Sequence, residues 1–110
     1  MDIAGVKKVI TGVDVTDNNC GAPLVAALGT THIDVLINNA GYFYGPVETL
    51  SSLNFEEELK MIDICAVGPL RVTAALFNAG LLSNDAKVRF HFYVFFRIYI
   101  IYICVCVECF

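Results

Sequence analysis

The chain has 110 residues, which is enough for one domain but short for a complete doubly wound α/β sheet. Its formal net charge is −4 and its 7 Lys and Arg residues do not cluster, which excludes a nucleic-acid-binding surface. The hydrophobic fraction of 57% is high, and most aromatic residues lie after Arg89. We therefore expect a folded part at residues 1–89 and an apolar tail at residues 90–110.

The first part of the chain predicts a strand followed by a short helix. Val9–Val13 is apolar and β-branched, typical of a strand, and it ends at Asp14–Val15. Pro23 suits a first helical turn, because its missing N–H would be unpaired there in any case. Leu24–Leu28 then continues as an apolar helix that Gly29 can close.

A second strand is predicted at Ile33–Ile37, and it completes a βαβ unit. Val35, Leu36 and Ile37 are consecutive apolar residues, which indicates a strand covered on both faces, as in a parallel sheet. The strand ends on Asn38–Gly41, whose glycine leaves no side chain in the way of a ligand. Because open parallel sheets bind ligands at the carboxyl ends of strands, this end predicts part of a nucleotide crevice.

A long helix is predicted from Asn54 to about Asn78. Asn54 and Glu57 have the spacing of a capping box, in which each side chain bonds the other residue's amide, and Gly80 suits the position after the helix. Pro69 cannot donate to the carbonyl of Cys65, so we expect a kink with a free carbonyl there. The apolar residues at helical spacing that we expect to face the sheet are Phe55, Leu59, Ile62, Ala66, Leu70, Thr73 and Phe77.

Three segments together resemble the short-chain dehydrogenase/reductase family. These are Asn38–Gly41, Asp14–Asp17 one βα unit upstream, and Gly68–Thr73 in the long helix, and the resemblance covers residues 6–89. It implies an α/β fold, namely a partial doubly wound, Rossmann-like parallel sheet with flanking helices. It also implies NAD or NADP as cofactor, an alcohol or carbonyl substrate, and a homodimer packed through the long helix.

The same resemblance implies five cofactor-binding residues. Asp14 and Val15 stand where the family contacts the adenine ring, and Asn38, Ala40 and Gly41 match contacts to the adenosine ribose and the sheet end. The residues alone leave structural alternatives open. Asp14 can form an Asx-turn at a strand end, and the two asparagines at the motif can tie neighbouring strands together.

Other parts of the family pattern are missing from this sequence. It has no Gly-x-x-x-Gly-x-Gly or Gly-x-Gly-x-x-Gly turn for a pyrophosphate. Cys65 stands at the position of the family's catalytic Asn, and the family's Ser and Tyr-x-x-x-Lys are absent. Tyr93 and Arg97 imitate only the spacing of the last pair. We therefore expect no catalytic residues and an inactive fragment.

The tail leaves several interpretations open. Lys87–Val88 starts a third predicted strand. Residues 90–107 nearly match a membrane thickness, although Arg97 would be costly in hydrocarbon, so membrane contact is open. A sticky strand-like segment is another interpretation. We favour sequence unrelated to the family, joined to a truncated domain. Cys104–Cys109 has thiol spacing, but a zinc site needs four ligands, and we expect no metal.

The cysteines also bear on location. Met1–Gly5 lacks the basic start and apolar core of a secretory signal, and 5 cysteines without such a signal indicate reduced thiols in the cytoplasm. Cys20 and Cys65 are expected to be small core residues. Two alternatives to an oxidoreductase fragment are a non-catalytic binding or membrane-associated protein that reuses the half-fold, and a chain whose unpaired strand edges prevent stable folding.

Overall fold

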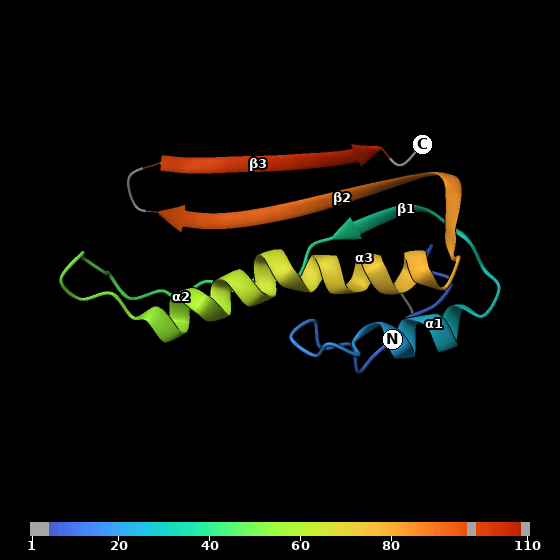
Figure 1. Cartoon of the computed structure of the whole chain (residues 1–110), viewed down its shortest axis with the longest axis horizontal. Helices are drawn as coiled ribbons and strands as arrows, with labels where there is room; N and C mark the ends of the chain where they lie inside the picture. Colours follow the sequence, from blue (N-terminus) through green and yellow to red (C-terminus); the bar gives the residue numbers. More distant parts are fainter. Residues whose placement is uncertain (1–4, 97–98, 109–110) are drawn as a thin grey trace.

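The computed structural model describes residues 5–96 and 99–108, and the side chains of residues 5–90. Its elements are α1 Gly21–Leu28, β1 Ile33–Asn38, α2 Phe55–Ile62, the π-helical segment η1 Asp63–Val67, α3 Gly68–Asn78, β2 Leu82–Phe96 and β3 Tyr99–Glu108 (Figure 1). The strands are hydrogen-bonded in the order β1-β2-β3.

A parallel crossover connects β1 to β2 through the long helix. The two strands pair in parallel, with Leu36 opposite Val88 and Asn38 opposite Phe90, whereas β3 returns antiparallel to β2. Parallel strands joined by a helix are the unit from which doubly wound sheets are built. The predicted partial Rossmann-like α/β fold is therefore confirmed. The third predicted strand is also present, but it begins at Leu82, before the expected Lys87.

The strand predicted at Val9–Val13 is wrong, because the structure assigns no strand to these residues. A strand is held by ladder hydrogen bonds to a neighbouring strand, and the described sheet has the order β1-β2-β3 without these residues. Within the described residues, Val9–Val13 has no adjacent backbone with which to form a ladder.

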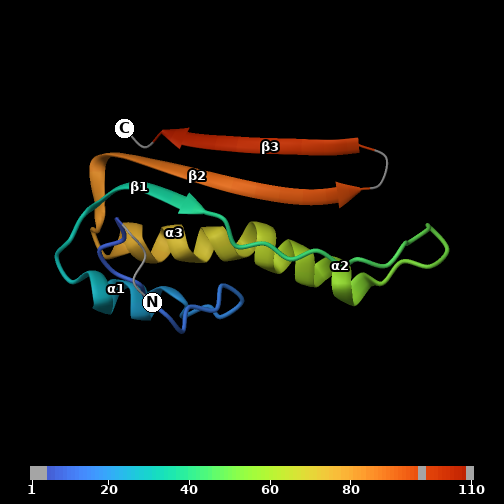
Figure 2. The ribbon, with the colours of Figure 1, turned by 180° about the vertical axis from the view of Figure 1, so that it is seen from behind.

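The sheet is covered by helices on one side. In both views the helices lie below the strands, with α1 packed against α3 (Figures 1 and 2). The expectation that β1 is covered on both faces is wrong, since Val35 is 54% and Ile37 57% exposed. Leu36 points to the other face and packs against the core. That core is centred on Cys20, Val72, Leu76 and Leu81.

The ends of the long helix follow the predicted capping chemistry in part. The Asn54 side chain accepts the Glu57 N–H at 3.2 Å, as expected. The reciprocal bond is absent, because the Glu57 carboxylate accepts from Tyr42 and the Asn54 N–H donates to Glu48. At the other end Gly80 has φ 69°, and the helix closes with a Schellman motif.

The helix is continuous but widened at η1, directly before Pro69. There the Gly68 N–H bonds the carbonyl of Asp63, five residues back. The sequence predicted a kink at this place. The structure has a π-helical widening there, since Pro69 cannot continue the ordinary hydrogen-bond ladder of the helix. The free carbonyl expected at Cys65 stays a prediction.

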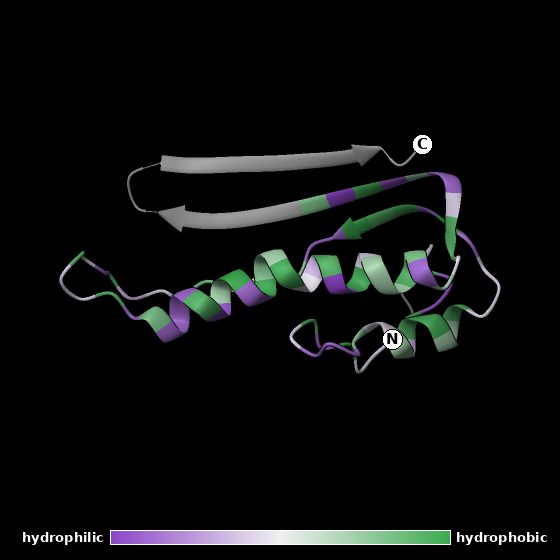
Figure 3. Ribbon diagram, viewed as in Figure 1, coloured by the Kyte–Doolittle hydropathy of each residue, from purple (hydrophilic) through white to green (hydrophobic). Residues whose placement is uncertain are grey.

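The face of the long helix predicted to lie on the sheet is wrong. Five of the apolar residues assigned to it are each more than half exposed: Phe55, Leu59, Ile62, Leu70 and Phe77. The buried face instead carries Cys65, Gly68, Pro69, Val72 and Leu76. Figure 3 shows hydrophobic and hydrophilic residues interspersed along the whole of the long helix. Small residues explain the choice, because Gly68 and Ala75 allow α3 to approach its neighbours more closely than bulky side chains would.

The tail contributes the end of β2 and all of β3, so its described backbone is strand. In the part of the chain that the structure describes, no helix has the length and apolar character needed to cross a bilayer. Nor do its described side chains bring together three His, Cys, Asp or Glu residues as metal ligands. The Cys104–Cys109 and Tyr93/Arg97 patterns lie outside the side chains described.

Candidate functional site

Asn38 fixes the carboxyl end of β1 to the long helix. This residue is buried, and its side-chain amide donates to Thr73 Oγ1 at 3.2 Å. The Thr73 hydroxyl in turn donates to the carbonyl of Pro69 at 2.8 Å. The Asn38 side chain therefore links strand to helix, while its backbone lies opposite Phe90 in the ladder between β1 and β2. Ala40 and Gly41 follow as exposed residues that a ligand can reach.

Asp14 forms the expected Asx-turn. One of its carboxylate oxygens accepts from the Thr16 hydroxyl at 2.7 Å and from the Thr16 N–H at 2.9 Å. These two bonds, the hydroxyl bond first, lower the pKa of Asp14 below its ordinary value. The turn and the cofactor interpretation are compatible, because only one carboxylate oxygen takes part in these bonds.

The loop at Asp14–Asn18 is held on α3 by two contacts that the sequence did not reveal. Arg71 donates to the Val15 carbonyl at 2.9 Å, to Asn18 at 2.8 Å and to Asp63 at 2.7 Å. Gly68 lies so close that an added Cβ would be 2.9 Å from the Val15 side chain. In the sequence, the hints of these contacts were Arg71, the one charged residue of α3, and Gly68 within the helix. Neither residue indicates by itself which part of the chain it contacts.

Cys65, predicted to stand at the position of the family's catalytic Asn, contacts the loop that follows Asn38–Gly41. It is buried, and its thiol lies 3.4 Å from the Tyr42 N–H nitrogen and 3.6 Å from the Tyr42 carbonyl oxygen. Tyr42 also donates its hydroxyl to Glu57 at 2.6 Å, and the Lys60 ammonium lies 4.2 Å from the centre of its ring. The expectation that Cys20 and Cys65 are core residues is confirmed.

The five predicted site residues thus lie in two segments, the loop at Asp14–Val15 and the end of β1 with the loop that follows it, both held on the long helix. Gly68 and Arg71 hold Asp14–Val15, whereas Thr73 and Cys65 hold the segment from Asn38 to Tyr42. Ala40 and Gly41 are exposed, and the described bonds of Asp14 use one of its two carboxylate oxygens.

The fit to a whole dinucleotide is not complete. A pyrophosphate is usually held at the N-terminus of a helix, where free N–H groups point outward. The start of α1 does not offer this, because Cys20 and Gly21 are buried and Gly21 packs against Ala75 of α3. The start of α1 therefore does not fit a pyrophosphate.

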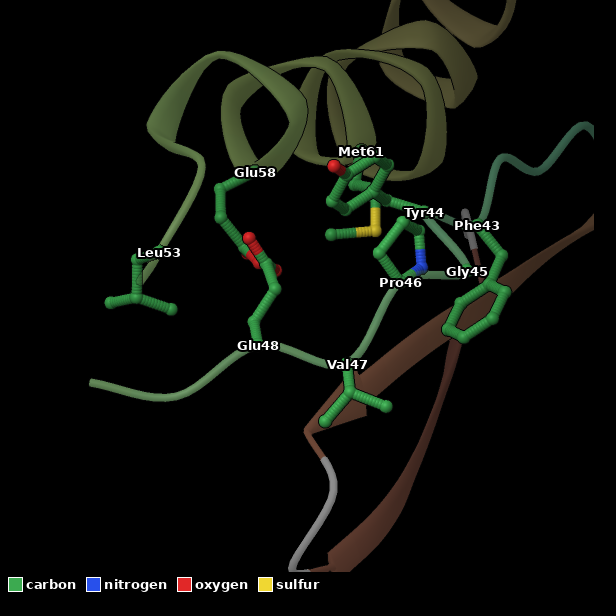
Figure 4. A pocket seen from close by; sticks show the side chains of 9 residues that line it. All are labelled: Phe43, Tyr44, Gly45, Pro46, Val47, Glu48, Leu53, Glu58 and Met61. Carbon is green, nitrogen blue, oxygen red and sulfur yellow. The ribbon is translucent and has the colours of Figure 1, made fainter. Parts of the chain in front are cut away.

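A separate cavity of about 320 Å³ lies between α2 and the loop before it (Figure 4). Its lining residues are Phe43, Tyr44, Gly45, Pro46, Val47, Glu48, Leu53, Glu58 and Met61. None of the five predicted site residues is among them. Within it Glu58 faces Glu48, and burial followed by the bond to Glu48 raises the pKa of Glu58 above its ordinary value.

The Glu58–Glu48 pair predicts a specific pH dependence. Because the pKa of Glu58 is raised by folding, this group stabilises the fold below its ordinary value of 4.5 and loses that contribution as pH rises through its folded pKa. Glu58→Gln should therefore be more stable than wild type at neutral pH, and the difference should shrink toward pH 4.5. Thermal melts across this range measure it. Glu56→Gln, which removes an exposed carboxylate of the same helix, is the control and should not show this trend.

A parallel crossover between β1 and β2 through the long helix is part of a Rossmann-like α/β fold. Solved structures support this class. A carbonyl reductase from Pseudomonas aeruginosa PAO1 is 32% identical with a TM-score of 0.60, over 72% of this chain and 34% of that one. A short-chain alcohol dehydrogenase from Burkholderia multivorans is 28% identical with a TM-score of 0.59, over 68% and 34%.

A third similar structure is a short-chain dehydrogenase/reductase from Burkholderia multivorans with bound NADP. It is 25% identical with a TM-score of 0.57, over 68% of this chain and 32% of that one. The sequence matches no protein-family model and no curated protein. The resemblance to short-chain dehydrogenases/reductases is confirmed in structure, and the chain spans about a third of the length of these proteins.

Proposed function

We propose that residues 1–89 are the adenosine-side part of an NAD(P)-dependent short-chain oxidoreductase acting on alcohol or carbonyl groups, and that this chain alone is inactive. The observation that carries the proposal is the joint anchoring of Asp14–Val15 and Asn38 on α3. The similarity to carbonyl reductase and to an NADP-bound relative supports the same cofactor class.

Each residue has a distinct role in this proposal. Asp14 and Val15 contact the adenine, Asn38 keeps the end of β1 in place, and Ala40 and Gly41 leave room for the ribose. A bound nicotinamide would supply the hydride chemistry. The described residues contribute only binding and orientation, because Cys65 keeps its thiol on the Tyr42 backbone.

The chain alone is expected to show no oxidoreductase turnover. The test follows the absorbance of reduced nicotinamide with generic carbonyl substrates and either NADH or NADPH. The matched control is a complete short-chain carbonyl reductase under the same conditions. Turnover above the enzyme-free blank would contradict the inactivity but leave the adenosine site standing.

We also propose a homodimer that uses the exposed apolar face of the long helix, which includes Leu59 and Leu70. Several large apolar side chains exposed on one helix favour a protein contact. Leu59→Glu should shift the sedimentation of the protein from dimer to monomer, because it buries a charge in the contact. Leu50→Glu is the control, since Leu50 is 96% exposed on a loop and away from this face. A monomeric wild type would contradict the proposal.

A non-catalytic binding protein is the second candidate, and the same exposed apolar face favours it. A cytoplasmic location is proposed for either candidate, because Cys20 and Cys65 are both free thiols.

A further inference from the structure

Arg71 connects the loop at residues 14–18, which is distant in sequence, to the long helix. Its Nε donates to Asn18 Oδ1 at 2.8 Å, its Nη1 to the Val15 carbonyl at 2.9 Å and its Nη2 to Asp63 at 2.7 Å. Each of the three nitrogens therefore has a different acceptor. The side chain is only 17% exposed, so these bonds are largely shielded from water.

The other polar bonds of the loop shape it without attaching it to α3. Asp14 bonds Thr16, Asn19 donates to Asp17, and the Asp17 N–H donates to the Asp14 carbonyl. These are bonds between close neighbours in sequence, which set a turn but not its position on the domain. Among the hydrogen bonds of the described residues, those from this loop to α3 are made by Arg71.

Packing at Gly68 adds contact but little orientation. The Val15 side chain lies against Gly68, and an apolar contact of this kind is not directional. The Arg71 fork is directional, because a planar guanidinium presents its donors at fixed angles. Two of its three bonds end on the loop and the third ends on Asp63 of η1, which in turn fixes the guanidinium.

We propose that Arg71 is the positioning residue of the adenine-side loop: it holds residues 14–18 on α3 in the form that receives the adenine of a nucleotide. The proposal rests on the proposed function, since it takes Asp14 and Val15 as the adenine contacts. Arg71 itself acts through the loop, by way of the Val15 carbonyl and Asn18, and not through direct contact with the base.

The test uses AMP as the probe and four variants of the full chain. Arg71→Gln removes the fork and the charge, Arg71→Lys keeps the charge but cannot reach three acceptors, and Asn18→Ala removes one loop contact. Arg89→Gln removes an equal charge from an exposed position on β2 and is the control. AMP affinity and amide hydrogen exchange of residues 14–18 are measured at a temperature at which each variant is folded by circular dichroism.

We expect both Arg71 variants to bind AMP about tenfold or more weakly than wild type, with faster exchange across the loop. Asn18→Ala should fall between them and wild type, and Arg89→Gln should stay within about twofold of wild type. A role confined to stability would lower the melting temperature of the Arg71 variants but leave AMP affinity of the folded protein unchanged. That result, or full rescue by Arg71→Lys, overturns the proposal.

The two proposals fail in distinguishable ways. A folded wild type that does not bind AMP overturns the proposed function and, with it, the role of the loop in nucleotide binding. The exchange measurement then still decides whether Arg71 orders residues 14–18. Weak AMP binding that is equal in wild type and Arg71→Gln overturns only the role of Arg71.

Discussion

Gly21→Ala is expected to be among the most destabilising single substitutions in this chain. A Cβ at Gly21 would lie 2.1 Å from the Cβ of Ala75, far inside contact distance. Both atoms are attached directly to helix backbones, so no side-chain rotation can relieve the clash. Helix α1 would have to move away from α3 and open the core around Cys20 and Leu76. We expect a loss of about 3 kcal/mol or more in the free energy of unfolding.

Denaturant unfolding or a thermal melt measures this loss. Gly45→Ala is the matched control, because a Cβ there meets nothing within 4 Å, and it should change stability little. Gly21→Ala combined with Ala75→Gly removes the second Cβ and should recover much of the loss. If Gly21→Ala melts like wild type, the packing of α1 on α3 described above is wrong.

Leu76→Ala should destabilise the fold by about 2–5 kcal/mol, because it leaves a cavity in the centre of the core. Leu76 is 1% exposed and is one of the largest fully buried side chains of the described residues. Its neighbours in the core come from α1, α3 and β1, so little of the cavity can be filled by a single local shift.

Phe77→Ala is the matched control for this substitution. Phe77 follows Leu76 on the same helix but is 64% exposed. Its loss should cost well under half as much in the same unfolding measurement. If the two substitutions had equal effects, or if Phe77 were the costlier loss, the buried face of α3 would be the one that the sequence pattern predicted.

Sequence patterns predicted those elements that local chemistry determines. The strand at β1, the end of α1 at Gly29, the Asn54 cap and the closing glycine Gly80 each depend on a few adjacent residues. The resemblance to short-chain dehydrogenases/reductases also rested on short local motifs, and the solved structures confirm it. Such features need no knowledge of what lies across the fold.

Features that depend on distant partners were not predictable. Val9–Val13 has strand-like residues, but a strand needs a neighbour, and the described sheet β1-β2-β3 does not include this segment. The inward face of the long helix was wrong for a related reason. Its spacing offers two faces with apolar residues, and the close approach at Gly21 and Gly68 decides between them.

The site shows the same division. Asp14 and Asn38 stand out in the sequence, whereas the residues that hold them in place do not. Arg71 reaches a loop more than fifty residues away in the chain, with Val15 standing 56 positions before it, and no pattern in the sequence joins the two. The sequence therefore predicts which residues meet a ligand, and the structure shows the residues that hold these segments in place.

The most direct test of the adenosine-side site is a titration of isotope-labelled protein with AMP, followed by amide chemical shifts. The account predicts shifts concentrated at Asp14, Val15, Ala40 and Gly41, with smaller changes at the cavity between α2 and its preceding loop. Shifts confined to that cavity, or none at all in a folded protein, would contradict it.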